Sequence, residues 1–328
     1  MKKLSFLFIL IFSVTFAVAQ SENPYRKIVV ALDESGEFTS IQKAINSCRD
    51  LGPGEVEIFI KKGVYHEKVQ IPTWKHQLTL VGEDKDETII SNADYSGKID
   101  AVTGKKHSTF TSYTLLVQGD DIHLKNITIK NASCNEGQAV ALHVEGDRFI
   151  AENCNLLGCQ DTLYTATAGS RQYYNQCFIE GTTDFIFGEA TVVFQDCTIK
   201  SLVNSYITAA ATPQNQAFGY VFFNAELIAA DGVDKVFLGR PWRSYAQTVF
   251  INTEMGAHIV KEGWNPWTGD KMFPEKEKTT YYAEYNSMGD GASPETRVSW
   301  SHQLTDKERK KYTTKNILKG CDGWNPEK

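Results

Sequence analysis

Two aspartates in the middle of the chain stand at a spacing that could bring them together. Asp161 lies in the run Gly158–Tyr164, and Asp184 lies 23 residues later in the run Gly181–Gly188. Gln138 precedes Asp161 by the same 23 residues. Two carboxyl groups held close together do not both ionise freely, so one keeps its proton as an acid while the other acts as a base or nucleophile. The spacing indicates such chemistry only if the chain coils with a period near 23 residues.

A repeat of the required period runs through the middle of the chain. Each repeat has a polar residue, then a small or β-compatible residue, and an aliphatic residue or methionine two positions further on. At spacings of 27, 23, 20, 28 and 28 residues, the polar positions are Asn126, Asn153, Gln176, Asp196, Asn224 and Asn252. Interrupted strands could also form a β-sandwich, but a sandwich does not require an aligned register. The register favours an all-β fold, a right-handed parallel β-helix, because solenoids repeat at this period and parallel crossovers are nearly always right-handed.

The two aspartates occupy equivalent places in this register. Asp161 is eight positions after Asn153, and Asp184 is eight positions after Gln176. Adjacent strands are about 5 Å apart, so the carboxyl groups should lie about that far apart on one face. Gln138 should lie one coil below Asp161. An aspartate in a Gly/Thr-rich turn can simply bond the backbone, but two in one register, accompanied by Gln160, favour a catalytic site.

Several sequence blocks resemble the pectin methylesterases (pectinesterases), a family of carbohydrate esterases on a right-handed parallel β-helix. The resemblance extends from about Ile28 to Gly320. The main blocks are Gln138–Leu142, Gly158–Tyr164, Gly181–Gly188 and Leu238–Trp242, and the supporting blocks are Gly63–Glu67 and Gly263–Trp267.

The resemblance implies a role for each polar residue of the site. Asp184 would be the nucleophile that attacks a galacturonate methyl ester, and Asp161 would be the general acid and then the general base. Gln138 and Gln160 would donate hydrogen bonds to the oxyanion. Arg240 would pair with Asp184 and keep it ionised. The implied partner is methyl-esterified pectin (homogalacturonan), with no cofactor.

The resemblance also implies an aromatic cleft for the sugar rings. The matching positions are Phe110, Tyr164, Phe187, Trp242 and Trp267. Plain core packing is the alternative for Phe110 and Phe187. The sequence departs from the family pattern at Thr183, where an aliphatic residue is more usual, and at His107 and Ser108. Because the family includes members that resemble lipoprotein thioesterases, a non-pectin ester is an alternative substrate.

Other functions fit the sequence less well. An inverting β-helical glycoside hydrolase would need its carboxyl groups about 6.5–9.5 Å apart. A polysaccharide lyase of this fold would be expected to hold Ca²⁺ in an aspartate-rich cluster, and a carbohydrate-binding protein would not need the polar set. The chain has no Gly-x-Ser-x-Gly elbow and no His-Glu-x-x-His motif, so we expect neither a serine hydrolase nor a metal enzyme.

The N-terminus predicts export. Lys2 and Lys3 precede an apolar run that ends in Ala17-Val18-Ala19, which is typical of a signal peptide cleaved after Ala19. A membrane anchor, the alternative, would need about 20 apolar residues. We therefore expect a signal peptide at 1–19, a single β-helix domain at 20–328, and a secreted monomer, periplasmic or extracellular, that is not held in a membrane. The formal net charge of −6 argues against nucleic-acid binding.

Capping boxes and cysteines give further expectations. Thr39 with Gln42 predicts a helix to Cys48 that covers the first coil, and Thr305 with Glu308 predicts a helix near the other end, in a tail packed on the solenoid.

Three of the seven cysteines share one register position and should be small buried core residues rather than disulfide-bonded cysteines or metal ligands. These are Cys154, Cys177 and Cys197. Disulfide pairing among the seven stays open.

Overall fold

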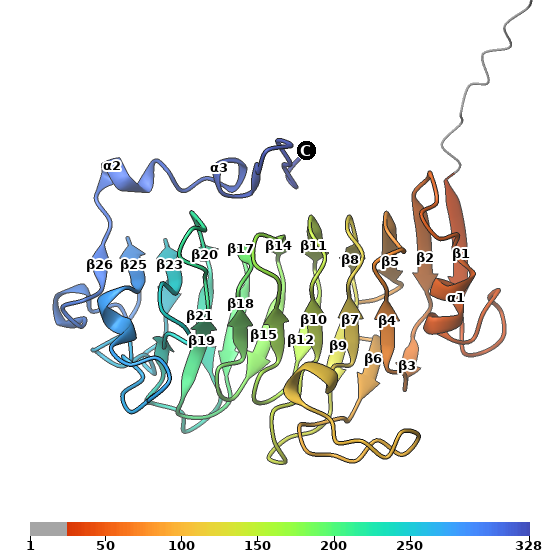
Figure 1. Ribbon diagram of the computed structural model, residues 1–328, viewed down its shortest axis with the longest axis horizontal. Helices are drawn as coiled ribbons and strands as arrows, with labels where there is room; N and C mark the ends of the chain where they lie inside the picture. Colours follow the sequence, from red (N-terminus) through yellow and green to blue (C-terminus); the bar gives the residue numbers. More distant parts are fainter. Residues whose placement is uncertain (1–24) are drawn as a thin grey trace, which may run out of the picture.

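The computed structural model describes residues 25–328, in which the strands form three parallel sheets wound around one axis (Figure 1). The expected signal peptide, residues 1–19, lies outside the described residues. The first sheet, in spatial order, comprises β1 (Arg26–Val30), β2 (Val56–Ile60), β5 (Leu78–Gly82), β8 (His123–Lys125), β11 (Phe149–Glu152), β14 (Arg171–Asn175), β17 (Thr191–Gln195), β20 (Tyr220–Phe223), β23 (Gln247–Ile251), β25 (Tyr281–Tyr285) and β26 (His302–Gln303). The second comprises β3 (Gly63–Tyr65), β6 (Thr88–Asn92), β9 (Thr128–Asn131), β12 (Asn155–Leu157), β15 (Phe178–Gly181), β18 (Thr198–Ser201), β21 (Glu226–Ala229) and β24 (Glu254–Met255). The third, which carries the site, comprises β4 (Val69–Ile71), β7 (Leu115–Val117), β10 (Leu142–Val144), β13 (Leu163–Thr165), β16 (Ile186–Gly188), β19 (Tyr206–Ala210) and β22 (Phe237–Gly239).

Strand pairing confirms the sequence register and the parallel β-helix. The residues three positions after each polar marker pair with one another in sequence along the second sheet, as Ile129, Leu156, Ile179, Ile199, Leu227 and Met255. The residues two positions before each marker pair in the same way along the first sheet, as Leu124, Ala151, Tyr174, Phe194, Phe222 and Phe250. Each repeat is therefore one coil.

The polar marker residues turn the chain from the first sheet to the second. All six have left-handed backbone conformations, with φ between 50° and 54°. Asparagine and aspartate tolerate this conformation better than most residues, which explains why the marker is usually Asn or Asp. Their side chains also connect successive coils, because the Asn153 amide donates to Asn126 at 2.8 Å and the Asn224 amide donates to Asp196 at 3.0 Å.

Stacked apolar side chains fill the solenoid. The rings of Phe194, Phe222 and Phe250 lie one above another, with centroids 4.4 Å apart at both steps. The three cysteines of the register are free and buried, as predicted, and burial raises the pKa of the Cys154 and Cys177 thiols well above the ordinary value. They act as small core residues in this interior.

The first coil is covered by helix α1 (Ile41–Ser47), as expected, but the predicted capping box was wrong. Ser40, not Thr39, is the N-cap, and its hydroxyl accepts a hydrogen bond from the Lys43 N–H. Glu67 accepts from two further N–H groups of the first turn. Gln42 instead pairs with the backbone of β4 through Gln70.

The C-terminal helices lie along the side of the solenoid rather than over its end. Helices α2 (Asp306–Arg309) and α3 (Thr314–Leu318) run back across the outer face of the first sheet (Figure 1), and α2 opens with the predicted Thr305–Glu308 capping box. Ile317 and Leu318 pack there on the outward side chains of the sheet. The last coil is instead covered by the segment that follows η3 (Pro294–Thr296), in which Trp300 packs against the core.

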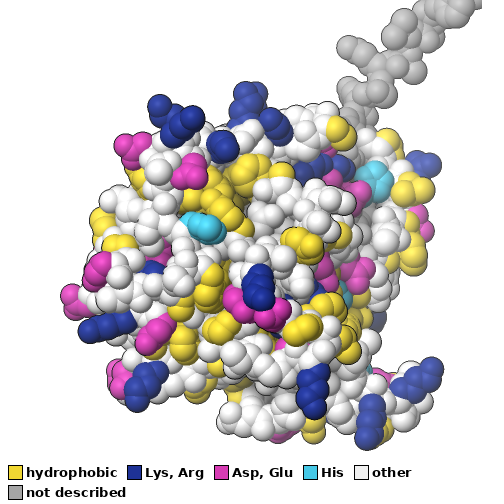
Figure 2. Space-filling model, turned by 60° about the vertical axis from the view of Figure 1, so that its left-hand side comes forward, with side chains coloured by type: hydrophobic (Ala, Val, Ile, Leu, Met, Phe, Trp, Pro, Cys, Tyr) yellow, Lys and Arg dark blue, Asp and Glu magenta, His cyan; other side chains and the backbone are white. Residues whose placement is uncertain are grey.

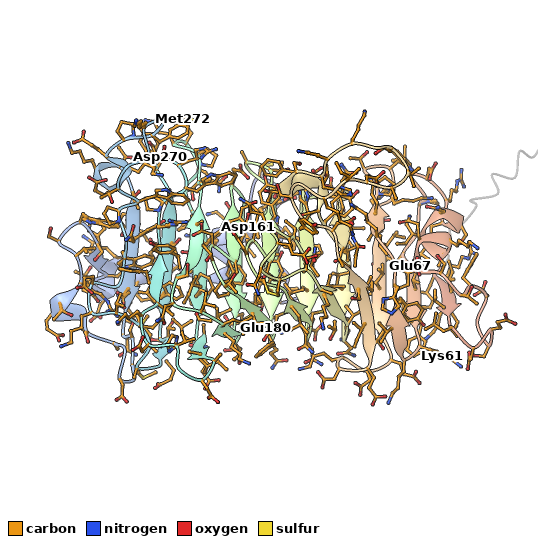
Figure 3. The ribbon with its side chains drawn as sticks, turned by 90° about the horizontal axis from the view of Figure 1, so that it is seen from below. Lys61, Glu67, Asp161, Glu180, Asp270 and Met272 are labelled. Carbon is orange, nitrogen blue, oxygen red and sulfur yellow. A yellow bond between two sulfur atoms is a disulfide. The ribbon has the colours of Figure 1, made fainter. Side chains whose placement is uncertain are left out.

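Two segments rise beside the third sheet. One contains η1 (Thr109–Thr111) and the other contains η2 (Lys276–Lys278). Figure 3 shows Asp161 near the middle of the solenoid, with the second segment, marked by Asp270 and Met272, projecting on the C-terminal side. On the face seen in Figure 2, charged side chains of both signs are interspersed with hydrophobic ones. The two segments form the walls of the site described next.

Candidate active site

Neighbouring coils present Asp161 and Asp184 at equivalent positions. β13 and β16 pair with Leu163 opposite Ile186, an offset of 23 residues that equals the spacing of the aspartates. The Asp161 N–H extends this ladder by donating to the Thr183 carbonyl at 3.1 Å. Asp161 and Asp184 both have left-handed backbone conformations, with φ of 66° and 50°. The chain thus turns sharply at each aspartate just before it enters a strand of the third sheet.

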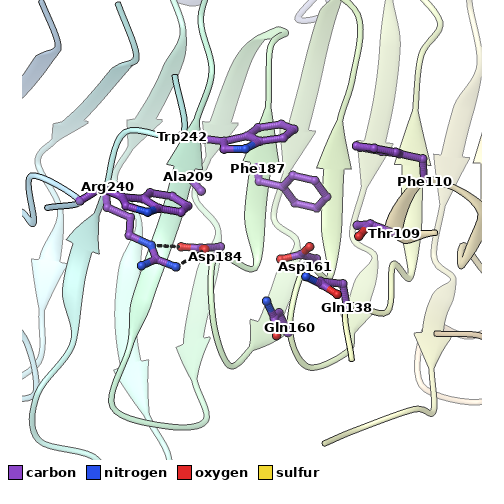
Figure 4. A pocket seen from close by; sticks show the side chains of 11 residues that line it. Thr109, Phe110, Gln138, Gln160, Asp161, Asp184, Phe187, Ala209, Arg240 and Trp242 are labelled. Carbon is purple, nitrogen blue, oxygen red and sulfur yellow. Dashed lines mark hydrogen bonds and ion pairs between the residues drawn. The ribbon is translucent and has the colours of Figure 1, made fainter. Parts of the chain in front are cut away.

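Arg240 holds the Asp184 carboxylate through both of its oxygens. Its Nε donates to Oδ1 at 2.9 Å and its terminal nitrogen donates to Oδ2 at 2.7 Å (Figure 4). The side chains are 18% and 8% exposed, so the pair is largely shielded from water. Burial raises the pKa of Asp184, whereas the hydrogen bonds and charge of Arg240 oppose that rise. A bidentate guanidinium pair is the geometry of an ionised carboxylate.

Asp161 is buried without a matching cation of its own. Burial raises its pKa well above the ordinary value, the negative charge of Asp184 adds to the rise, and Arg240 only partly opposes it. Within residues 25–328, no hydrogen bond reaches the Asp161 carboxyl group. Asp161 is therefore set to hold a proton beside an ionised Asp184, which is the separation of acid and nucleophile that paired carboxyl groups allow.

Two amide side chains flank the carboxyl groups. The Ala139 N–H donates to the Gln160 carbonyl at 3.0 Å, so Gln138 and Gln160 lie on adjacent coils. In Figure 4 both glutamines lie on one side of the carboxyl groups and the labelled aromatic rings lie on the other. Neither amide side chain is hydrogen-bonded within the part of the chain that the structure describes. Their N–H groups are free to donate to a substrate oxygen.

A cavity of about 250 Å³ brings together nine of the ten predicted site residues. The nine are Gln138, Gln160, Asp161, Asp184, Arg240, Phe110, Phe187, Trp242 and Trp267. Tyr164 is not among the lining residues, although we expected it in the cleft. It is buried, with its ring stacked on the Phe187 ring at a centroid distance of 4.5 Å and 5.3 Å from the Phe110 ring. Tyr164 thus supports the wall instead of forming it.

Sequence reasoning missed several residues around the cavity. Thr109 and Ala209 also line it, and Ala209 pairs with Phe187 on the adjacent coil, so the repeat could have identified it. Lys276 had no signal in the sequence. Its ammonium group is buried 4.3 Å from the centre of the Trp267 ring, and the Arg240 guanidinium is 3.6 Å from the same centre. Trp267 is thereby held by two cations.

A disulfide lies next to the amide pair. Cys134 bonds to Cys159, the residue before Gln160, and resolves one pairing that the sequence left open. The remaining five cysteines are free, and of these only Cys321 is exposed.

The described residues contain no group of three or more His, Cys, Asp or Glu side chains arranged to hold a metal ion. Within the same residues, no helix combines the length and apolar character that crossing a bilayer requires.

The fold and site together define a class: parallel β-helix proteins with paired aspartates, an arginine partner and amide donors in an aromatic cleft. The chain belongs to the pectinesterase family, whose family model matches residues 27–321. Pectinesterase 2 of Citrus sinensis is 36% identical to this chain over 318 residues, which cover 92% of the chain and 59% of the relative. Pectin methylesterase from carrot superposes with a TM-score of 0.82 at 32% identity, covering 90% of this chain and 93% of that one.

A pectin methylesterase in complex with a hexasaccharide gives a TM-score of 0.79 at 31% identity, covering 91% of this chain and 98% of that one. The chain spans only 59%, 50% and 55% of the length of three curated pectinesterase relatives that it matches.

Proposed function

We propose that this protein is a pectin methylesterase, which hydrolyses the methyl esters of galacturonate units and releases methanol and pectate. The observation that carries the proposal is the asymmetry of the aspartate pair. Asp184 receives two hydrogen bonds from Arg240, whereas the neighbouring Asp161 has a strongly raised pKa and, among residues 25–328, no cation of its own. One cavity thus contains an ionised nucleophile, a protonated acid and two amide donors.

In the first half-reaction, the Asp184 carboxylate attacks the ester carbonyl carbon. The carbonyl oxygen gains negative charge, and the free amide N–H groups of Gln138 and Gln160 stabilise it. When the tetrahedral intermediate collapses, the bond to the methoxy oxygen breaks and Asp161 gives its proton to the leaving group. Methanol departs, and the galacturonyl group stays on Asp184 as an acyl-enzyme.

In the second half-reaction, Asp161 has become a carboxylate and takes a proton from water. The resulting hydroxide attacks the acyl carbon, and the same amides stabilise the second oxyanion. The product leaves as a galacturonic acid unit that loses its proton to solvent, Asp184 becomes a carboxylate again beside Arg240, and Asp161 has regained its proton. Each turn therefore consumes one ester and one water and returns every group to its starting state.

The cleft suits a polysaccharide. Phe110 is 45% exposed at its rim, and the rings of Phe187 and Trp242 form a continuous apolar wall with centroids 5.7 Å apart. Sugar rings pack their C–H faces on such surfaces. The relative bound to a hexasaccharide supports an oligosaccharide ligand for the cleft. An ester or thioester outside pectin, or cleavage of the sugar chain itself, are the alternatives that the experiment must separate.

The proposal includes the cellular setting inferred from the sequence. We propose that residues 1–19 are removed, that residues 20–328 act as one domain and as a monomer, and that the enzyme is secreted. It would work without a metal or cofactor, and it would bind neither nucleic acid nor membrane.

Methanol release from highly methylated pectin in the presence of EDTA tests the proposal. We expect release by the wild type, and release reduced at least about 10³-fold in Asp184→Ala and Asp161→Ala, since catalytic groups that act together lose most of their effect when either is removed. No shortened or unsaturated sugar products should appear. Folded wild type that releases no methanol would exclude the pectin substrate. Near wild-type release by Asp184→Ala would refute the nucleophile.

A further inference from the structure

The Cys134–Cys159 disulfide cross-links the two segments that carry the amide donors. Cys159 directly precedes Gln160, and Cys134 lies four residues before Gln138. The Cα atoms of the two cysteines are 5.4 Å apart, across neighbouring coils. The cross-link therefore lies beside the position where the oxyanion would form.

The segment from Cys134 to Gly137 has little else to hold it. Within residues 25–328, no hydrogen bond of its backbone or side chains joins these four residues to the rest of the protein. The last contacts before the segment are made by Ser133, which bonds Asn131 and the Ala93 carbonyl. Cys134, Asn135 and Glu136 are exposed. The disulfide is the strongest restraint on this stretch of chain.

The far side of the segment is open. Asn135, Glu136 and Gly137 line a second groove of about 460 Å³, which Gln160 shares with the catalytic cavity. The groove gives the segment room to move outward once the disulfide is lost.

Gln138 depends on this segment for its approach to the site. Gly137 has a left-handed φ of 151° and passes so close to the Ser96 carbonyl that an added Cβ would lie 3.0 Å from its oxygen. After this turn, the Ser96 N–H donates to the Gln138 carbonyl at 2.8 Å. Gln138 is thus fixed by hydrogen bonds on its C-terminal side and by the disulfide-bound segment on its N-terminal side.

We propose that the Cys134–Cys159 disulfide is a positioning element that holds Gln138 beside Gln160 for stabilising the oxyanion. The inference rests on the proposed esterase function. The cysteines touch no substrate and act through the Gln138 amide. Removing an oxyanion donor outright costs about 10²–10³-fold in kcat. Because the Gln138 carbonyl keeps its hydrogen bond from the Ser96 N–H, opening the disulfide should lower kcat by about tenfold only.

The test uses Cys134→Ser/Cys159→Ser, which leaves no thiol at the site of the disulfide, and Cys321→Ser as the matched control. We expect kcat for methanol release to fall about tenfold in the double variant, with KM within twofold of wild type and the acid limb of the pH profile unmoved. Dithiothreitol should lower kcat of the wild type to the same degree and leave the double variant unchanged. Cys321→Ser should behave as wild type.

A double-mutant cycle separates positioning from general destabilisation. In a Gln138→Ala background, the disulfide variant should cost no further activity, because the amide that it positions is already gone. Full activity of the double variant, or equal losses with and without the Gln138 amide, would overturn the inference.

Amide hydrogen exchange tests, without measuring turnover, whether the disulfide holds the Gln138 segment in place. The Ser96 and Ala139 N–H groups, which donate to the Gln138 and Gln160 carbonyls, should exchange faster in the double variant while the strands keep their protection. Unchanged exchange at these two N–H groups would also overturn the inference. If the proposed function fails, oxidised wild type releases no methanol, an outcome distinct from any effect of the disulfide.

Discussion

Replacing Arg240 with methionine should remove the charge that keeps Asp184 ionised while retaining an apolar stem. The arginine and the carboxylate are 18% and 8% exposed and share two hydrogen bonds of 2.9 and 2.7 Å. Removing one partner of such a buried pair costs about 3–5 kcal/mol, because the remaining charge is uncompensated. The carboxyl group can avoid this cost by binding a proton, and each tenfold loss of the ionised form corresponds to about 1.4 kcal/mol.

This penalty predicts a kcat/KM for methanol release about 10²–10³-fold lower in Arg240→Met at neutral pH. The rising acid limb of the pH profile should move to higher pH, because Asp184 loses its proton later. Arg240→Lys keeps a cation but not the bidentate geometry and should lose less, about tenfold. Arg243→Met is the control for the acid limb, which should stay in place, since the guanidinium of Arg243 stacks on Trp242 and Phe273 without pairing with Asp184. An acid limb that stays in place in Arg240→Met, with kcat/KM within threefold of wild type, would refute the reasoning.

Three further predictions concern stability and substrate affinity. The fold raises the pKa of Asp161, so its stabilising effect is complete below the unfolded pKa of about 4 and is lost as pH rises through the folded value. Asp161→Asn should therefore match wild type near pH 3.5 and be more stable by about 0.5–2 kcal/mol at pH 8 in denaturant titrations; equal stability at both pH values would contradict this. Lys276→Met removes one of the two cations that pack on the Trp267 ring, an interaction that contributes about 1 kcal/mol. The variant should raise KM for pectin about fivefold with little change in kcat. An unchanged KM would show that the ring does not need this lysine. Phe222→Ala opens the middle of the stacked core column and should cost about 3–5 kcal/mol in urea unfolding, so that a loss below 1 kcal/mol would argue against tight stacking.

The coils were predictable because two local requirements recur in every one of them. A corner in the left-handed conformation selects Asn, Asp or Gln, and the inward position two residues before or three residues after it selects an apolar side chain. Both requirements appear in a single sequence, so the positions of Asn153 and Gln176 could be aligned without an alignment of relatives. The relation between Asp161 and Asp184 follows from the same offset.

Features outside the coils could not be predicted in this way. Lys276 and Trp267 lie in a segment with no repeat, so nothing in their spacing indicates that they meet. The pairing of Cys134 with Cys159 depends on the path of an irregular segment. At the first helix, Glu67 comes from a later coil to bond the N–H groups that a local capping box would otherwise serve. Such contacts depend on tertiary structure, which local patterns do not encode.

The C-terminal tail has a consequence for how this solenoid unfolds. In a simple stack each coil touches only its neighbours, so terminal coils can fray independently. Here the tail leaves the last strand and returns to the middle of the stack, where Asp322 binds Arg171 at 2.5 Å and lies 3.6 Å from Arg148. Fraying of the last coils would also pull on these contacts many coils away. The tail thus acts as a strap that couples distant coils, and it should make unfolding more cooperative than the linear architecture alone would allow.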